Sequence, residues 1–233
     1  MTVAEKARTK STRGPHAERS ASMRQRLVDA AIACLCRVGY AATTTQLVMD
    51  EAGVSRGAML HHFPTKVDLV IAVGEYAAAA QNRHVRRRLA VVPEGMERYL
   101  ALTETTWEAM CQPPAIALVE IMVASRSDPS LGERFPQVID ALEAQQREDV
   151  WVMAQELGIA DRDSVERMIR LHRAAMRGLA LEQVFKGDRG SAEAAMELLE
   201  WYKRELTGKL LIQRSAPLFP EAQTVTTPEE PRA

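Results

Sequence analysis

The first 66 residues carry the charged side chains best suited to bind a polyanion. They contain ten Lys or Arg against five Asp or Glu, a net charge of +5, whereas residues 67–233 contain twenty against twenty-six, a net charge of −6. The whole chain therefore has a formal charge of only −1. A basic first quarter joined to an acidic remainder predicts a head that binds a polyanion and a body with a different role.

Histidine and cysteine spacing argues against a metal site or a disulfide framework. His61 and His62 are adjacent, so on a helix their side chains point about 100° apart. Cys34 and Cys36 lie two residues apart and Cys111 is remote, which leaves an odd count without ligand spacing. We expect no metal and mostly buried, reduced thiols in a cytoplasmic protein, and a redox sensor is the alternative. The polar N-terminus resembles no secretion signal, and no apolar run reaches the ~18 residues of a membrane helix.

Motifs of the common enzyme classes are missing from the sequence. It has no glycine-rich phosphate loop, no HExxH pair and no nucleophile elbow. Residues 125–128, with sequence SRSD, are more simply the end of a helix. We therefore expect neither an enzyme nor a cofactor.

The elements that must position the basic residues are all helical. Apolar residues recur at helical spacing along the chain, and no segment sustains the alternation of a strand. The pattern predicts an all-α fold of about nine helices, over residues 27–38, 43–52, 55–63, 64–80, 96–110, 116–124, 136–157, 164–185 and 191–211. Residues 1–22 read as a flexible basic arm, either inert or in contact with the same polyanion, and the proline-rich residues 213–233 read as a disordered tail.

Residues 39–66 have the pattern of a helix-turn-helix motif. Thr43 and Gln46 predict a capping box for the first motif helix, Gly53 marks the turn, and Ser55 predicts the cap of the second helix. In this motif the second helix enters the DNA major groove. Helix, glycine and helix in succession are common by themselves, but here they coincide with the basic segment. We therefore expect residues 23–66 to form a three-helix DNA-binding domain.

At this point the sequence resembles the TetR family of one-component transcriptional regulators. The resemblance covers roughly residues 24–70 closely, and beyond them the helical layout and the length agree. Its motifs in order are Gly39-Tyr40, Thr43-Thr44, Ala52-Gly53-Val54-Ser55, Gly57, His62-Phe63 and Lys66.

The resemblance implies that the two motif helices contact both the DNA backbone and the bases. Thr44 would meet a phosphate at the start of the first motif helix. Thr45 and Arg56 would read base edges, since an arginine can pair bidentately with guanine, although Arg56 could also be an ordinary solvated charge. Gly57 and Ala58 would let the recognition helix approach the groove closely.

Further implied DNA contacts lie at the end of the recognition helix, where the sequence also departs from the family. His61, His62 and Lys66 would contact phosphates. Leu60 stands where the family usually has tyrosine, and it would touch a thymine methyl group or face water. Met49 stands in place of a small residue and would repack the junction between the motif helices.

The resemblance also implies that residues 67–212 form a helical regulatory and dimerisation domain. Its last two helices would join two copies, and a two-fold dimer predicts a palindromic operator. Apolar stripes on residues 164–185 and 191–211 fit either this interface or an internal core. The arginines at positions 167, 170, 173 and 177 follow one helix face, which is typical of solvated or paired charges.

Large and adaptable side chains on the presumed helices of the body fit either a small-molecule pocket or an ordinary core. The candidate lining residues are Trp107, Met110, Met122, Arg126, His172 and Met176. Of these, His172 or Arg126 would orient a polar or anionic group of the ligand. The expected function is a repressor that leaves its operator when a small molecule binds the body. The alternative is a helical protein-interaction module that no longer binds DNA specifically.

Overall fold

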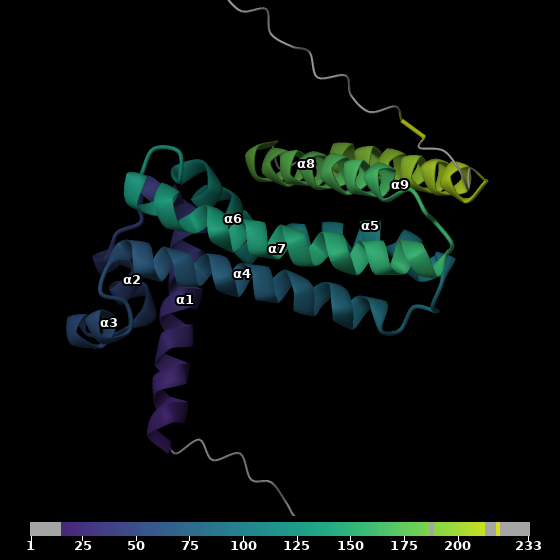
Figure 1. Ribbon diagram of the computed structural model, residues 1–233. Coiled ribbons are helices and arrows are strands. Elements are labelled where there is room, and N and C mark those ends of the chain that lie inside the picture. Colours follow the sequence, from purple (N-terminus) through teal and green to yellow (C-terminus); the bar gives the residue numbers. More distant parts are fainter. Residues whose placement is uncertain (1–14, 187–188, 213–217, 220–233) are drawn as a thin grey trace, which may run out of the picture. The chain divides into compact units, whose positions relative to one another are not determined.

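The computed structural model describes residues 15–186, 189–212 and 218–219. These residues form nine α-helices and no strand (Figure 1), which confirms the expected all-α fold. The helices are α1 (Pro15–Ala42), α2 (Thr45–Ala52), α3 (Arg56–His62), α4 (Lys66–Leu89), α5 (Met96–Met110), α6 (Pro113–Ala124), α7 (Pro129–Glu156), α8 (Arg162–Lys186) and α9 (Arg189–Ile212). No helix among the described residues combines the length and the apolar character needed to cross a bilayer.

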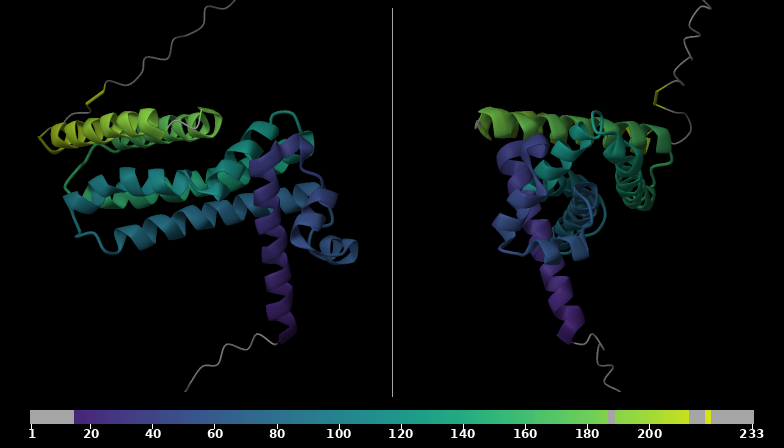
Figure 2. Two further views of the ribbon diagram at one scale, coloured as in Figure 1. Left: turned by 180° about the vertical axis from the view of Figure 1, so that it is seen from behind. Right: turned by 90° about the vertical axis from the view of Figure 1, so that its left-hand side faces the viewer.

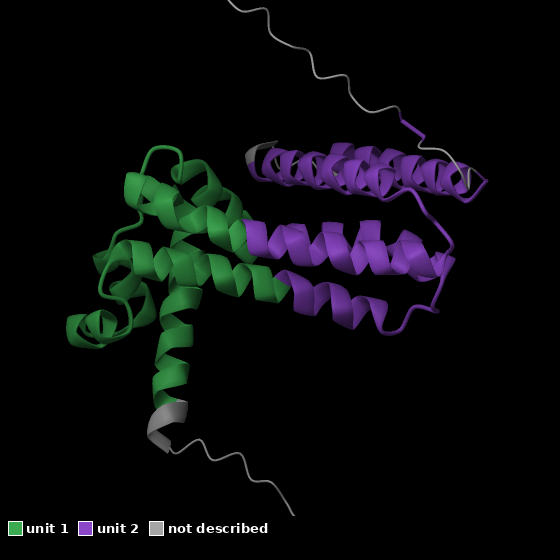
Figure 3. Cartoon of the chain, in the orientation of Figure 1, with its two compact units in different colours: residues 1–80, 112–139 green, residues 81–111, 140–233 purple. Residues whose placement is uncertain are grey.

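The helices group into two compact units (Figure 3). Unit 1 comprises the described residues up to 80 together with 112–139, and unit 2 comprises 81–111 and the described residues from 140 onward. Helices α4 and α7 each contribute to both units. The division therefore differs from the boundary after residue 66, because α6 packs against α1 and belongs to the unit of the motif helices.

Helix α1 begins at Pro15, so residues 15–22 are helical although the sequence indicated a flexible arm there. Proline suits the first turn of a helix because its missing N–H needs no partner there. The first turns of α1 extend beyond α2 and α3 (Figures 1 and 2). The rest of the expected arm, residues 1–14, and nearly all of the expected tail, 213–233, lie outside the described residues.

The capping box predicted for Thr43 is wrong by one residue. Thr43 instead ends the preceding segment, where its N–H and its hydroxyl both donate to the Gly39 carbonyl, at 3.2 and 2.7 Å. Gly39 itself has φ 72°, which interrupts the regular helix as expected. Thr44 is the N-cap of α2, and its hydroxyl accepts a hydrogen bond from the Leu47 N–H at 3.1 Å. The predicted cap of α3 is confirmed, because Ser55 Oγ accepts from the Ala58 N–H at 3.3 Å.

Helix α7 starts seven residues earlier than the sequence indicated. Pro136 lies inside the helix, which begins at Pro129. The first turn is held by Asp128, whose carboxylate accepts from the Leu131 N–H at 3.2 Å and whose carbonyl accepts from the Gly132 N–H at 2.8 Å. This local cap supports the first turns of α7, so the backbone hydrogen bond that a proline removes does not end the helix here.

Candidate functional site

Helices α2 and α3 present the polar side chains that the sequence assigned to DNA. Arg56 is the first residue of α3 and is exposed, as is Thr44 beside the start of α2. A Cβ atom built on Gly57 would meet nothing within 4 Å, so this face of α3 is open to a partner. Leu60, with 47% of its surface exposed, and His61 continue the exposed face. Thr45 and Ala58 are half-buried beside it.

The opposite faces of the motif helices form the core of the head. Val48, Met49, Met59 and Phe63 are all buried. Met49 retains only 7% exposure, and its carbonyl accepts from the N–H of Val54 at 3.1 Å in the turn between α2 and α3. The side chain thus contributes to the packing of this junction, as the sequence predicted.

Two arginines of α1 fasten α2 in place. Arg26 Nη2 donates to the carbonyl of Ala52 at 2.6 Å, in the last turn of α2. Arg37 Nη2 pairs with Glu51 Oε2 at 2.9 Å. Gly53 then ends α2 with φ 62°, a left-handed conformation that suits glycine, and the chain turns into α3. These contacts hold α2 against α1, and the Gly53 turn joins α2 directly to α3.

The two adjacent histidines at the end of α3 differ in environment. His61 is exposed and His62 is half-buried. Burial and the nearby charges of His61 and Arg24 lower the pKa of His62, and Arg24 lies 5.2 Å from the centre of the Phe63 ring. Among the residues that the structure describes, no cluster of three or more His, Cys, Asp or Glu could hold a metal ion.

Lys66, assigned to a phosphate by resemblance, contacts the end of α1. Its Nζ donates to the Tyr40 carbonyl at 2.8 Å, and Tyr40 Oη donates to Asp128 Oδ2 at 2.5 Å. Burial lowers the pKa of Lys66, although the charge of Asp128 opposes this shift. Burial and the bond to Asp128 raise the pKa of Tyr40. These contacts join α1, the start of α4 and the turn before α7.

Unit 2 contains a cavity of about 120 Å³. Its walls come from the C-terminal half of α4 and from α5, α7, α8 and α9, and they are largely apolar. Of the predicted pocket residues, Met110, His172 and Met176 line this cavity. Trp107 instead packs against the buried cluster that contains Met110 and Met176. Met122 and Arg126 belong to unit 1.

Five buried polar side chains line the same cavity, namely Gln81, Thr103, His172, Arg173 and Lys203. His172 has Nδ1 at 3.0 Å from the Met168 carbonyl and Nε2 at 3.2 Å from the Leu199 carbonyl, and burial lowers its pKa. Both ring nitrogens thus face backbone acceptors. Arg173 and Lys203 were not predicted for this site. One signal could have found Lys203, because it shares the helical spacing of an apolar stripe made by Met196, Leu199, Leu206 and Leu210.

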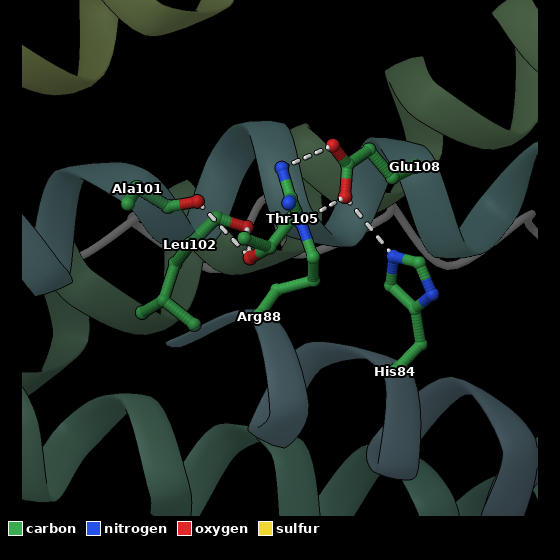
Figure 4. Close-up of polar contacts among 6 residues, drawn as sticks. All are labelled: His84, Arg88, Ala101, Leu102, Thr105 and Glu108. Atoms are coloured by element: carbon green, nitrogen blue, oxygen red, sulfur yellow. Dashed lines mark hydrogen bonds and ion pairs between the residues drawn. The ribbon is translucent and has the colours of Figure 1, made fainter. Parts of the chain in front are cut away.

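A polar cluster fixes α4 against α5 (Figure 4). Arg88 donates twice to Glu108, with Nε to Oε2 and Nη2 to Oε1 both at 2.8 Å, and His84 Nε2 lies 3.0 Å from Oε2. Burial opposes ionisation of Glu108, but these hydrogen bonds hold its pKa below the usual value. A bidentate arginine–carboxylate pair has a defined geometry, so this cluster sets the spacing of two helices that line the cavity.

Comparisons with known proteins find relatives among bacterial transcriptional regulators. A model of the family described as bacterial regulatory proteins, tetR family, matches residues 27–73. The HTH-type transcriptional regulator CymR of Pseudomonas putida is 29% identical over 177 residues, which is 76% of this chain and 87% of that protein. The HTH-type transcriptional repressor AcnR of Corynebacterium diphtheriae is 32% identical over 113 residues, 48% of this chain and 55% of that protein.

A solved structure shows that the likeness extends over most of the fold. GusR of Salmonella enterica superposes with a TM-score of 0.60 at 24% identity, covering 86% of this chain and 99% of that one. The family match spans the C-terminal part of α1, α2, α3 and the start of α4, and it includes the exposed face of α3. Over residues 27–73 the chain carries the regulatory-protein domain of the TetR family, and the relatives support a DNA-binding transcriptional regulator.

Proposed function

We propose that the chain is a repressor that binds a palindromic operator as a homodimer and leaves it when a small molecule occupies the cavity of unit 2. The observation that carries the DNA-binding part is the exposed Arg56 at the first position of α3, next to the open face at Gly57. An arginine at the N-terminal end of a recognition helix can reach guanine O6 and N7 in the major groove. A repressor of this kind acts on chromosomal DNA in the cytoplasm.

Exposed apolar side chains on the last two helices support dimer formation. Leu171 and Val184 on α8, and Leu198 and Trp201 on α9, are each about half exposed or more. Trp201 is exposed by 58%, although tryptophan is usually highly buried. A second copy of the chain would cover these side chains, as in a four-helix bundle. Met168, Met196 and Leu206, from the stripes that fitted either role, are instead buried within the chain.

The two-fold symmetry of a dimer explains why the operator should be palindromic. Two recognition helices related by a two-fold axis read the same sequence on opposite strands. Successive major-groove sites on one face of the duplex lie roughly 34–36 Å apart, and the dimer must hold its two α3 helices near that separation.

Helix α4 supports the link between ligand and DNA. It starts at Lys66, whose contact with Tyr40 ties it to α1, and its residues 81, 82, 85 and 86 line the cavity. A ligand that binds one conformation of this helix better than another would shift the population toward that conformation. A changed separation of the two α3 helices would then weaken the fit to both half-sites.

Selection of bound fragments from a randomised duplex pool at about 0.15 M salt tests this proposal, because specific binding is meaningful only at a stated salt concentration. The expected result is an inverted repeat, bound by two copies of the chain in sedimentation experiments. Enrichment of no sequence, with the helical content and the dimer intact, would contradict the proposal. It would favour the protein-interaction module, for which the exposed Leu60 on α3 would provide an apolar contact.

A further inference from the structure

The cavity of unit 2 has more buried positive than negative charge on its walls. Arg173 and Lys203 both line it, with exposed fractions of 9% and 3%. Among the described residues that line the cavity, one has an acidic side chain, Asp149, and that residue is exposed. A buried ion is costly unless a charge of opposite sign pairs with it.

Arg173 is only partly compensated by protein groups. Its Nη1 contacts Glu143 Oε2 at 2.5 Å, but the other oxygen of Glu143 accepts from Arg177 Nη2 at 3.1 Å. One carboxylate thus serves two guanidinium groups. Within the described residues, the buried Nη2 of Arg173 has no hydrogen-bond partner. This cation is therefore available for a further acceptor.

Lys203 has neutral acceptors in place of an ion pair. Its Nζ donates to the Tyr99 carbonyl and lies 4.4 Å from the centre of the Tyr99 ring. No carboxylate lies within ion-pair distance of this amine in the part of the chain that the structure describes. The hydrogen bond satisfies one donor of the ammonium group, and the negative charge of Glu200 acts on it without forming an ion pair within the described residues.

The other walls of the cavity determine the size and polarity of the ligand that it can hold. Leu102, Met110, Met168 and Met176 line the cavity with apolar, adaptable side chains. An engineered protein cavity of about 150 Å³ holds benzene. The volume here, about 120 Å³, therefore suits an apolar body of about one small ring or a short chain.

We propose that the cavity binds a small amphipathic carboxylate, whose carboxylate group pairs with Arg173 and Lys203 and whose apolar body packs against the methionines. This proposal rests on the proposed function, because it names the chemical class of the ligand at the cavity of that repressor. A carboxylate supplies acceptors for the Arg173 guanidinium and the missing negative charge for both cations. A neutral amide of the same shape supplies one acceptor oxygen but no negative charge.

The experiment compares matched probes by titration calorimetry on the full chain at pH 7 without DNA. The probes are 4-methylbenzoate and hexanoate, their neutral amides, and the cation 4-methylbenzylamine. At least one carboxylate is expected to bind about tenfold or more tightly than its amide, the scale of a charge-assisted hydrogen bond. Arg173→Met and Lys203→Met should each remove that preference, with a much larger loss of affinity for the carboxylate than for the amide. Arg170→Met, an exposed arginine on the same helix that does not line the cavity, is the matched control.

Retained amide binding shows that a variant is folded with its cavity intact. Equal affinity for carboxylate and amide, preference for the amine, or no binding by any probe would overturn the proposal. Release of the selected DNA fragment is measured separately. A carboxylate that binds without releasing DNA contradicts the effector part of the proposed function and leaves the ligand class standing. If only a neutral compound releases the DNA, the effector part of the proposed function stands and the carboxylate ligand class is contradicted.

Discussion

The Nζ atom of Lys66 donates a hydrogen bond to the Tyr40 carbonyl at 2.8 Å and lies 3.9 Å from the centre of the Tyr40 ring. The two residues are separated by α2 and α3, so this contact closes the head around its recognition motif. It gives Lys66 a positioning role, whereas the resemblance alone implied a phosphate contact.

Lys66→Met therefore tests which role dominates. We expect the free energy of unfolding to fall by roughly 1–3 kcal/mol, the range for a hydrogen bond from a charged group. The salt dependence of DNA binding should keep its slope. Thermal unfolding and a salt titration of binding measure the two effects, with the exposed Lys209→Met as control. An unchanged unfolding temperature with a slope reduced by about one would instead show a phosphate contact.

Gly57→Ala separates DNA contact from protein packing. The added Cβ meets no protein atom within 4 Å, so stability should stay the same or rise by up to ~1 kcal/mol. DNA binding should weaken by about 1–3 kcal/mol, as for an overpacked contact, because the methyl group would face the groove. Competition binding measures this loss. Undiminished affinity would show that α3 does not approach DNA at this position.

Gly74→Ala is the counterpart of Gly57→Ala, because here the added Cβ would collide with a protein side chain. A Cβ there would lie 2.6 Å from Cε2 of Phe135, so the two helices that meet at this point must move apart. Stability should fall by about 1–3 kcal/mol, measured by denaturant unfolding. Unchanged stability would show that the Phe135 ring turns aside at no cost.

Trp201→Glu should disrupt the proposed dimer. A charge in the middle of an apolar helix–helix contact should weaken association by about 2 kcal/mol or more, the scale of an interface hot spot. Sedimentation velocity over a concentration series measures the shift toward monomer. Val91→Glu places the same charge on another exposed apolar residue, between α4 and α5, and should leave the dimer intact. Equal behaviour of the two variants would argue against α9 as the interface.

Lys203 predicts a pH dependence of stability with a definite sign. Burial lowers its pKa from the ordinary 10.5 to about 7, although Glu200 opposes this shift. Above pH 7 the folded chain without ligand therefore progressively loses a proton that the unfolded chain still holds at pH 9. Stability from this group rises with pH across that window, because the cost of burying the charge is relieved. Lys203→Met should be more stable than the parent at pH 7 and should show a smaller rise, measured by denaturant unfolding at each pH. Parallel curves would contradict the buried-cation assignment.

Local signals made much of the fold predictable from the sequence. Gly53 and Ser55 each act within one helical turn. Their residue types alone therefore located the C-terminus of α2 and the N-terminus of α3. Thr43 and Thr44 show the limit of such signals. Both are residues that can cap a helix, but only Thr43 has a glutamine three residues on, and the choice depends on the carbonyl of Gly39, which Thr43 already contacts. Pro136 was read as a boundary because its effect on a helix is usually disruptive, but the Asp128 cap lies upstream.

The candidate sites were predictable to different degrees. The exposed recognition residues follow from one short motif, in which each helix position has a known direction. The cavity is built from five helices distant in sequence, so periodicity could not show which side chains meet there. Arginine and lysine are almost never fully buried unless they are paired. The spacing of Arg173 predicted a solvated or paired charge, and the side chain is buried and paired with Glu143.

Methylation interference on the selected DNA fragment tests the central claim most directly, since it reports contacts at guanine N7 in the major groove. We predict interference at guanines in two symmetric half-sites, roughly one helical turn or 34–36 Å apart. Arg56→Ala should remove interference at those guanines and cost about 1–3 kcal/mol of discrimination between the selected and other sequences. Binding that is insensitive to guanine N7 methylation, or an interference pattern that Arg56→Ala leaves unchanged, would contradict sequence reading through α3.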